Sequence, residues 1–290
     1  MSDEKQMIKV SVIIPTHNRE DILMRTIFSV QKQTEKNIEI LVCDDGSTDR
    51  TKESVEKCSE SDPRIRYISC GHNGRPAIPR NIGIREAKGE WLAFLDDDDL
   101  WNPVKLEAQL YALEKSGSKA CCTNAFLYED GKNTGKRYFP GEEDKVYGFK
   151  DIIRANPVIC SSMMIHHSLI ENCIGFAEGQ RLAAIEDYAF WYRICGYTEI
   201  YYVGKALTGY LVTSSTSIRK SNALTFEEQQ AIVEEDFAKW LEDKGDELKS
   251  KYEAERERSR QMIKQENRDR KRQEAVAKLK RFVKKLIGRK

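Results

Sequence analysis

Strand-like and helix-like segments alternate through the first 115 residues of the chain. Runs with the length expected of strands occupy residues 8–14, 38–43, 64–70 and 91–95. Amphipathic segments predict helices at about residues 20–33, 49–58, 76–88 and 103–116. The first two strand runs are almost continuously apolar, as in strands buried on both faces. This alternation predicts an α/β fold with a doubly wound, mostly parallel sheet.

The second half of the chain has a mixed pattern that ends in a long charged region. Strands are expected near residues 119–128 and 198–204, and a helix near residues 186–195. The sequence TFEE at residues 225–228 has the form of a capping box, which predicts the start of a further helix. We therefore predict one domain, a charged helical extension and a basic amphipathic helix. Their boundaries are residues 1–222, 223–274 and 275–290, and the domain divides into a first half to about residue 115 and a second half over 116–222.

The bulk composition is that of a soluble protein with no overall bias toward nucleic acid. The chain has 290 residues, 40% of them hydrophobic, and a formal net charge of +1. No apolar run precedes the first strand, and none approaches the ~18 residues of a membrane-spanning helix, so a cytoplasmic location is expected. Eight cysteines form no CxxC pair, which favours reduced and mostly buried thiols.

Polar residues cluster where three of the predicted strands end. These clusters cover residues 15–19, 44–47 and 96–99. In open parallel sheets, ligands bind outside the carboxyl ends of the strands. The three clusters should therefore face one binding site, although they lie far apart in the sequence.

Four consecutive aspartates, Asp96 to Asp99, follow the strand predicted at residues 91–95. Hard cations such as Mg2+ and Mn2+ prefer carboxylate oxygens and keep positions open for water and phosphate. Alternate residues of an extended segment point the same way, so Asp96, Asp97 and Asp98 can supply such oxygens. A cation that bridges both phosphates of a nucleotide diphosphate would neutralise charge on the leaving oxygen. The alternative is an acidic turn that is simply solvated.

Two weaker signals also suit a nucleotide. In residues 44–49, a carboxylate at a strand end can accept the N3 hydrogen of uracil, and glycine lets the backbone approach the base. A turn followed by a helix N-cap explains the same residues. Arg75 and Arg80 can pair with phosphate oxygens, or they can be surface arginines that flank the start of a helix.

An acidic and aromatic segment begins at Glu186 and Asp187 and continues through Tyr188 and Trp191. Glycosyl transfer with inversion needs one base that takes the proton of the acceptor hydroxyl. A carboxylate among aromatic rings suits that task, because the rings can stack on sugars. An amphipathic helix with acidic residues in its first turn is the alternative.

Together these segments resemble the family 2 glycosyltransferases, which have the GT-A fold and use nucleotide-diphosphate sugars. The resemblance rests on pieces in the family's order and covers about residues 8–215. They are VSVIIPTHNR (10–19), LVCDDGSTD (41–49), NGRPAIPRNIGI (73–84), WLAFLDDDDLWNP (91–103) and EDYAFWYRI (186–194). The resemblance implies an inverting, metal-dependent enzyme with a GT-A sheet.

The family pattern also implies a role for each matching position. Asp187 would be the catalytic base, with Glu186 shaping the acceptor or donor-sugar pocket. Asp98 would hold Mn2+ or Mg2+, with Asp96 in the same loop, and Asp45 would meet the uracil. The residues expected at the nucleotide sugar are Pro15, Thr16, Asn18, Arg19, Asp45, Arg75, Arg80, Asp96 and Asp97, and those expected at the acceptor are Trp191 and Tyr188.

The chain departs from the family pattern in its late serine-rich segment, residues 210–220. Some members have a histidine there that is available to the metal or the diphosphate, whereas this chain has Arg219. An arginine can neutralise phosphate but cannot ligate a metal. The chain also has no QxxRW motif, which argues against a processive polysaccharide synthase.

The last 16 residues combine an apolar stripe at helical spacing with a basic face that has no acidic residue. The basic residues are Lys278, Lys280, Arg281, Lys284, Lys285, Arg289 and Lys290. This composition is typical of a helix in an anionic membrane interface, so peripheral attachment to the cytoplasmic face of a membrane is expected. A helix docked on its own domain or in a homo-oligomer is the alternative, and no specific nucleic-acid binding is expected.

These features predict transfer of a hexose or N-acetylhexosamine from a UDP-sugar to a hydroxyl of a glycan or lipid-linked saccharide. Two other functions remain open. A sugar-nucleotide pyrophosphorylase would need a glycine-rich, basic loop after the first strand, and residues 15–21 contain no glycine. A catalytically inactive GT-A-like binding protein would not need the carboxylates at positions 45, 96–98 and 187.

Overall fold

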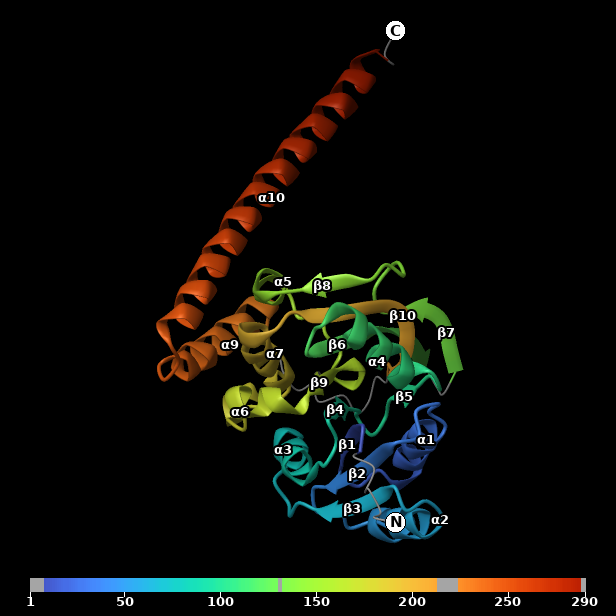
Figure 1. The fold of residues 1–290 in the computed structure, drawn as a ribbon. Coiled ribbons are helices and arrows are strands. Elements are labelled where there is room, and N and C mark those ends of the chain that lie inside the picture. The colour runs from blue at the N-terminus through green and yellow to red at the C-terminus, as the bar shows by residue number, and fades with distance from the viewer. Residues whose placement is uncertain (1–7, 130–131, 213–223, 288–290) are drawn as a thin grey trace.

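The computed structural model describes residues 8–129, 132–212 and 224–287, with residues 279–287 described by their backbone alone. A ten-stranded sheet runs through the centre of the molecule, and one half of it consists of four parallel strands (Figure 1). These strands are β3 (Ile65–Ser69), β2 (Ile38–Asp44), β1 (Val10–Thr16) and β4 (Trp91–Phe94), in that spatial order. The connecting helices are α1 (Glu20–Gln31), α2 (Thr51–Ser61) and α3 (Ala77–Glu86).

The strand order reverses direction between β1 and β4. The chain adds β2 and β3 on one side of β1 and then crosses back to place β4 on the other side. Such a reversal leaves a crevice at the carboxyl ends of the two strands, where ligands of doubly wound sheets bind. The fold therefore directs attention to the loops that follow β1 and β4.

The other half of the sheet mixes parallel and antiparallel pairs. Its strands are β5 (Leu100–Trp101), β6 (Ala120–Glu129), β7 (Lys132–Arg137), β8 (Lys145–Tyr147), β9 (Met164–His166) and β10 (Ile200–Leu211). β9 lies antiparallel between β4 and β6, and β10 runs parallel to β6. The predicted mostly parallel α/β sheet is confirmed, and the antiparallel strands are additions at its second half.

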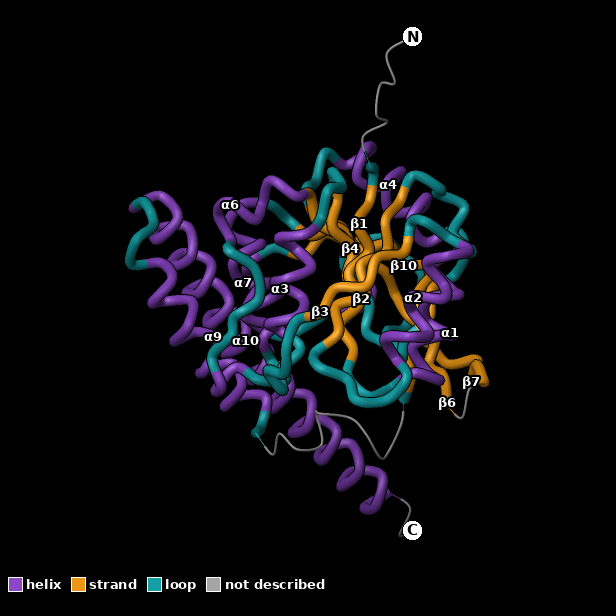
Figure 2. The backbone as a smooth tube through the Cα atoms, turned by 90° about the horizontal axis from the view of Figure 1, so that it is seen from below, coloured by secondary structure: helices purple, strands orange, loops and turns teal. Residues whose placement is uncertain are grey.

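Helices cover both faces of the sheet, so the sheet is the middle of three layers (Figure 2). The later helices are α4 (Lys105–Ser116), α5 (Phe149–Arg154), α6 (Ile170–Cys173), α7 (Glu186–Tyr197), α9 (Phe226–Leu241) and α10 (Asp246–Ile287). Alternation along β1 divides its side chains between two cores: Val12 belongs to a core with α1, α2 and α4, whereas Ile13 belongs to a core with α3, α5, α6, α7, α9 and α10. Three short 3-10 turns lie at Cys160–Ser162, His167–Leu169 and Gln180–Leu182.

The C-terminal extension is helical, as expected. The predicted capping box is present, because Thr225 accepts the amide of Glu228 and Glu228 accepts the amide of Thr225. The first third of α10 packs on the domain through the buried Tyr252, and Arg154 pairs with Glu266. Beyond this contact the helix continues away from the domain (Figure 1).

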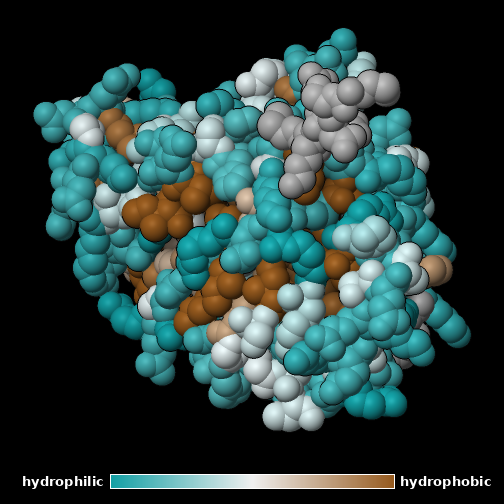
Figure 3. Space-filling model, turned by 60° about the horizontal axis from the view of Figure 1, so that its bottom comes forward, coloured by the Kyte–Doolittle hydropathy of each residue, from teal (hydrophilic) through white to brown (hydrophobic). Residues whose placement is uncertain are grey.

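The surface is hydrophilic around its rim, and hydrophobic side chains reach it mainly in a recessed central region (Figure 3). Across the described part of the chain, no helix combines the length and the apolar character that a membrane crossing requires.

Candidate active site

A cavity of about 410 Å³ opens at the carboxyl edge of β1, β2 and β4, at the reversal of strand order. All but three of the predicted site residues line it. They are Pro15, Thr16, Arg19, Asp45, Arg75, Arg80, Asp96, Asp97, Asp98, Glu186 and Asp187. The structure thus brings together segments that are up to 170 residues apart in the chain.

The four aspartates form a turn that is held by threonines from neighbouring elements. The Thr26 hydroxyl on α1 lies 2.8 Å from the carbonyl oxygen of Asp97 and 2.9 Å from that of Asp99. The Thr16 hydroxyl at the end of β1 donates to Asp97 Oδ2 at 2.8 Å. These contacts fix the turn against β1 and α1, so the carboxylates keep their directions without a ligand.

Arg19 lies between two of these carboxylates. Its Nη1 is 2.9 Å from Asp97 Oδ1 and 3.0 Å from Asp98 Oδ2. Burial raises the pKa of Asp97 to about 6, while the charge of Arg19 opposes that rise. Burial, followed by the nearby charge of Asp96, raises the pKa of Asp98. Asp97 and Asp98 therefore share one arginine, whose single positive charge can offset only one of the two carboxylates.

Asp99 is the most enclosed member of the turn, with 1% of its surface exposed. Its Oδ1 accepts the amide of Leu211 at 2.9 Å, which ties the turn to the end of β10. Burial raises the pKa of Asp99 well above its usual range, with Asp98 and Asp96 adding to the effect. Asp99 therefore connects the aspartate turn to the end of β10.

Arg80 lines the cavity, and within the protein it forms two ion pairs. Its guanidinium is buried, and it pairs with Asp96 Oδ1 at 2.6 Å and with Glu186 Oε1 at 2.7 Å. It also lies over the ring of Phe176, 5.1 Å from the centroid. Both terminal nitrogens of the guanidinium are therefore paired with protein carboxylates. Arg80 joins the aspartate turn to the start of α7 and offers little of its charge to a ligand.

Asp45 lies at the cavity wall and holds the loop that follows β3. Its Oδ1 accepts the amide and the side-chain amide of Asn73, each at 2.8 Å, and its Oδ2 accepts the amide of Gly74 at 2.7 Å. Carboxylate oxygens accept about two hydrogen bonds each, so Oδ2 retains capacity for one further donor. Arg75, the next residue, donates to the carbonyl of Glu178 and lines the same cavity.

Asn18 does not line the cavity, contrary to the prediction that it contacts the nucleotide. Its backbone has a positive φ of 52°, and its amide donates to Ser47 Oγ at 2.8 Å. Its side-chain oxygen accepts the amide of Thr48 at 2.7 Å. Asn18 therefore connects the loops after β1 and β2, because an Asn side chain tolerates this backbone conformation and satisfies the neighbouring loop.

Glu186 and Asp187 begin α7, where the positive end of the helix dipole favours carboxylates. Asp187 Oδ1 accepts the amide of Tyr188 at 2.6 Å, and 8% of the residue is exposed. Both carboxylates face the cavity that also holds the aspartate turn. A partly desolvated carboxylate at this point can act on a hydroxyl placed in the cavity.

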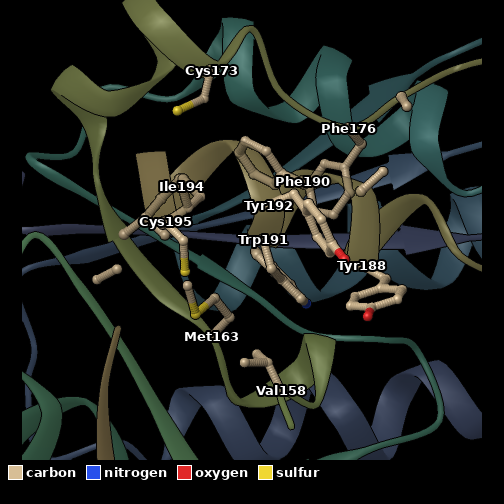
Figure 4. Packing of buried hydrophobic residues seen from close by; sticks show 14 of the residues in the cluster. Val158, Met163, Cys173, Phe176, Tyr188, Phe190, Trp191, Tyr192, Ile194 and Cys195 are labelled. Atoms are coloured by element: carbon tan, nitrogen blue, oxygen red, sulfur yellow. The ribbon is translucent and has the colours of Figure 1, made fainter. Parts of the chain in front are cut away.

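The expected acceptor contacts of Trp191 and Tyr188 are wrong for this structure, because both rings lie in the hydrophobic core. Trp191 is 0% exposed and Tyr188 is 1% exposed. The Tyr188 hydroxyl donates to the carbonyl of Ile152 at 2.7 Å. Figure 4 shows Trp191 directed toward Met163 and Val158, among other buried side chains. Helical periodicity turns these rings inward from the first turn of α7, so they position the helix and do not reach a ligand.

The described residues provide two carboxylates suited to a shared cation. No three His, Cys, Asp or Glu side chains among them converge as a complete metal site. Asp96 lies close enough to Asp98 for its charge to raise the pKa of Asp98. Mg2+ is commonly bound through one or two carboxylates together with substrate phosphates and water. The donor set therefore fits a cation held jointly with a diphosphate.

Several cavity residues were not expected from the sequence. His17, Cys160, Ala184 and Tyr210 also line it. His17 directly follows Thr16 and belongs to the cluster at residues 15–19, whereas Tyr210 lies near the end of β10, where the late serine-rich segment begins. Arg219, expected near the diphosphate, lies outside the described residues.

Comparison with known proteins identifies the family. The sequence profile described as Glycosyl transferase family 2 matches residues 11–172, more than half of the chain. The chain belongs to this family of glycosyltransferases, and the doubly wound sheet with its site at the strand reversal is the GT-A fold.

Individual relatives agree with this assignment. An uncharacterized glycosyltransferase of Rickettsia felis is 36% identical over 72% of this chain, and the matched part spans about a third of that protein's length. The protein called UDP-Glc:alpha-D-GlcNAc-diphosphoundecaprenol beta-1,3-glucosyltransferase WfaP, from Escherichia coli, is 34% identical over 64% of this chain and 69% of its own. Residues 1–349 of TarS from S. aureus, solved in complex with UDP, superpose with a TM-score of 0.58 at 25% identity, covering 71% of this chain and 61% of that one.

Proposed function

We propose that this protein is an inverting glycosyltransferase that moves a hexose or N-acetylhexosamine from a UDP-sugar to a hydroxyl of a lipid-linked saccharide. One observation carries the proposal. A single cavity at the strand reversal contains the end of β2, the aspartate turn after β4 and the acidic start of α7. Candidate positions for the nucleotide base, the cation and the catalytic base thus border the same space, as a transfer from a nucleotide sugar requires.

The donor would bind with its uracil toward Asp45 and its diphosphate toward the aspartate turn. Oδ2 of Asp45 has capacity for the N3 hydrogen of uracil, and the loop at Gly74 brings backbone close to the base. Asp98 and Asp96 would hold Mg2+ or Mn2+, which neutralises charge on the departing diphosphate when bound. Arg75 borders the cavity as a further positive group for the phosphates. The complex of TarS with UDP supports a uridine nucleotide in a site of this fold.

Asp187 would accept the proton of the acceptor hydroxyl. As the proton passes to its carboxylate, the hydroxyl oxygen forms a bond to the anomeric carbon on the face opposite the phosphate. The bond between that carbon and the phosphate oxygen breaks, and the nucleoside diphosphate leaves. Glu186, held by Arg80, would border the donor sugar and keep α7 in register with the aspartate turn.

The acceptor class is inferred from relatives. The printed name of WfaP specifies a saccharide on diphosphoundecaprenol as acceptor and UDP-glucose as donor. A saccharide carried on a lipid diphosphate would bring its free hydroxyl to the cavity while its lipid remains in a membrane.

The two alternative functions are less well supported. The loop after β1 contains no glycine, and a pyrophosphorylase would need a glycine-rich loop to surround a triphosphate. An inactive binding protein would not need Asp98 and Asp187 beside the same space.

A donor screen tests the proposal. UDP-sugars and GDP-sugars are incubated with the full-length protein and Mg2+ or Mn2+, and release of free nucleotide diphosphate is measured with and without EDTA. We expect slow hydrolysis of one or more UDP-sugars that EDTA abolishes. Hydrolysis of GDP-sugars alone would exclude the uridine assignment, and no metal-dependent release from any donor would favour an inactive binding protein.

We further propose that the C-terminal helix attaches the enzyme to an anionic membrane. The support is the run of seven basic residues over 278–290 and the direction of α10, which leads away from the domain (Figure 1). Each basic residue near an anionic surface contributes roughly 1 kcal/mol, so seven suffice for reversible binding.

Vesicle co-sedimentation tests the membrane proposal. Full-length protein should pellet with anionic vesicles, bind less as the salt concentration rises, and lose binding when it is truncated after Glu274. Neutral vesicles serve as the control. Equal binding by the truncated protein would overturn the proposal, and a change of oligomeric state on truncation would assign the helix to a contact between copies.

A further inference from the structure

A second cavity, of about 430 Å³, lies between α1 and the strands β5, β6 and β10. Its side-chain lining includes Arg25, Phe28, Lys32, Trp101, Phe126 and Tyr128. None of these residues takes part in the site described above. The cavity is as large as the first one, which makes it a candidate for a ligand of its own.

The lining is basic and aromatic. Arg25 and Lys32 are its only charged residues, and within the described chain neither forms an ion pair with a carboxylate. Lys32 Nζ lies 4.1 Å from the centroid of the Phe28 ring, and 55% of Phe28 is exposed. An exposed aromatic ring flanked by two uncompensated cations favours a ligand that carries both a negative charge and an apolar part.

The floor of the second cavity is fixed by specific contacts. Gly209 lies beneath the Tyr128 ring so closely that an added Cβ would be 2.9 Å from a ring carbon. The Trp101 indole donates to the carbonyl of Ser161 at 2.7 Å, and its backbone amide donates to Ser29 Oγ at 3.1 Å. The cavity is thus preformed, as is usual for small-molecule sites.

The two cavities meet at the paired strands β5 and β10. On β10, Tyr210 lines the first cavity and Gly209 lines the second. Leu100, the first residue of β5, lines the second cavity, and Asp99 just before it lines the first cavity. The two cavities are therefore neighbours that are separated by adjacent residues of the same two strands.

We propose that the second cavity binds the diphosphate and the first isoprenoid units of a polyprenyl-diphosphate-linked acceptor, whose sugar enters the first cavity. This inference rests on the proposed function, because it assigns the carrier end of the acceptor. Arg25 and Lys32 bind the diphosphate, and Phe28 and Tyr128 contact the isoprenoid. The negative charge of the carrier is thereby kept apart from the carboxylates of the first cavity.

Farnesyl diphosphate is a soluble probe for this site. Its dissociation constant is measured by calorimetry on the full-length protein with saturating UDP and Mg2+, so that the first cavity is occupied. We expect binding that weakens about tenfold or more in the double variant Arg25→Glu/Lys32→Glu, because two charge-assisted contacts are reversed. Lys36→Glu, an exposed lysine outside the lining, is the matched control and should bind as the wild type does.

Two further ligands distinguish the chemistry. Pyrophosphate and farnesol should each bind more weakly than farnesyl diphosphate, since each offers half of the contacts. Equal affinity for pyrophosphate would reduce the site to a phosphate site and overturn the proposal. Equal binding of farnesyl diphosphate by the wild type and the double variant, or no binding, would overturn it as well. The donor screen is independent of these measurements, so hydrolysis of a UDP-sugar together with no farnesyl diphosphate binding would reject the second site and retain the proposed function.

Discussion

The two cavities have nearly the same volume and share a wall, but their charges are opposite. The first is lined by seven carboxylates, at positions 45, 96–99, 186 and 187, with three arginines among them. The second has two cations and no carboxylate in its described lining. Volume therefore does not distinguish the two cavities. The charge of the lining distinguishes them. The carboxylates suit the first cavity to a diphosphate bound together with a cation, and the cations suit the second cavity to an anion that binds without a metal.

Buried ionisable groups extend this contrast into the protein interior. Burial raises the pKa of Asp97 to about 6 at the first cavity. Behind the second cavity, burial lowers the pKa of Lys105 to about 7, and its Nζ lies 4.0 Å from the Trp101 ring centroid. Each cavity thus has a buried ionisable group of the same sign as its lining, Asp97 at the first and Lys105 at the second. Burial makes the charged form of each group unfavourable.

The largest effect is expected from Asp98→Ala in the first cavity. We expect it to abolish metal-dependent transfer, because Asp98 and Asp96 are the carboxylates that fit the cation. The fold should survive, since burial and Asp96 already disfavour the charged form of Asp98. Turnover and the thermal midpoint are compared with those of Asp243→Ala, an exposed aspartate far from the site. Full metal-dependent turnover by Asp98→Ala would remove Asp98 from the metal site.

A smaller but still large effect is expected from Asp187→Asn. Loss of a general base should lower kcat at least ~100-fold. Asparagine keeps the size of the side chain and an oxygen that can accept the amide of Tyr188, so the start of α7 should be unchanged. Nucleotide affinity should change little. If the variant keeps most of its kcat while Glu186→Gln loses it, Glu186 is the base.

The sequence predicted the four parallel strands of the first half and the first cavity well, because both depend on local pattern, whereas it did not predict β5, β7, β8 and β9. Buried parallel strands are continuously apolar, and observed β2, Ile38–Asp44, extends only one residue beyond the predicted run. The strand expected at 8–14 is observed two residues later, at Val10–Thr16. Polar clusters at strand ends converge in any sheet of this topology, so most of the predicted site residues line one cavity.

The predictions failed where the outcome depends on the direction of a side chain or on contacts between segments that are far apart in the sequence. Trp191 was expected at the acceptor, but which way a helical side chain points depends on how the helix packs, and α7 is buried on nearly every side. The ion pairs of Arg80 were also missed, because its partners, Asp96 and Glu186, come from other segments of the chain. The second cavity could not be predicted at all, because its lining residues from α1 and the C-cap Lys32 face strand residues that lie 68 to 184 positions further along the chain, and no motif marks that contact.

The smallest effect tests the interior behind the second cavity, through Lys105→Met. Lys105 is 0% exposed, and its ammonium donates to Gln109 Oε1 at 2.6 Å. Its pKa falls from 10.5 to about 7 because burial disfavours the charged form. Each unit of that shift corresponds to about 1.4 kcal/mol of cost in the folded state at neutral pH. Methionine removes this cost but leaves the Gln109 oxygen without a donor, which costs about 1–3 kcal/mol.

We therefore expect Lys105→Met to raise the free energy of unfolding by about 2 kcal/mol at pH 7. Between pH 7 and about 10, the unfolded wild-type chain holds a proton on Lys105 that the folded chain has released, so wild-type stability gains with rising pH. The variant lacks this gain, and its advantage should shrink as pH rises from 7 to 9. Urea unfolding of both proteins at several pH values measures the difference, with Lys36→Met as the exposed control. A constant difference across this range would mean that Lys105 keeps its charge in the fold, and that the contacts with Gln109 and Trp101 stabilise the ammonium enough to offset burial.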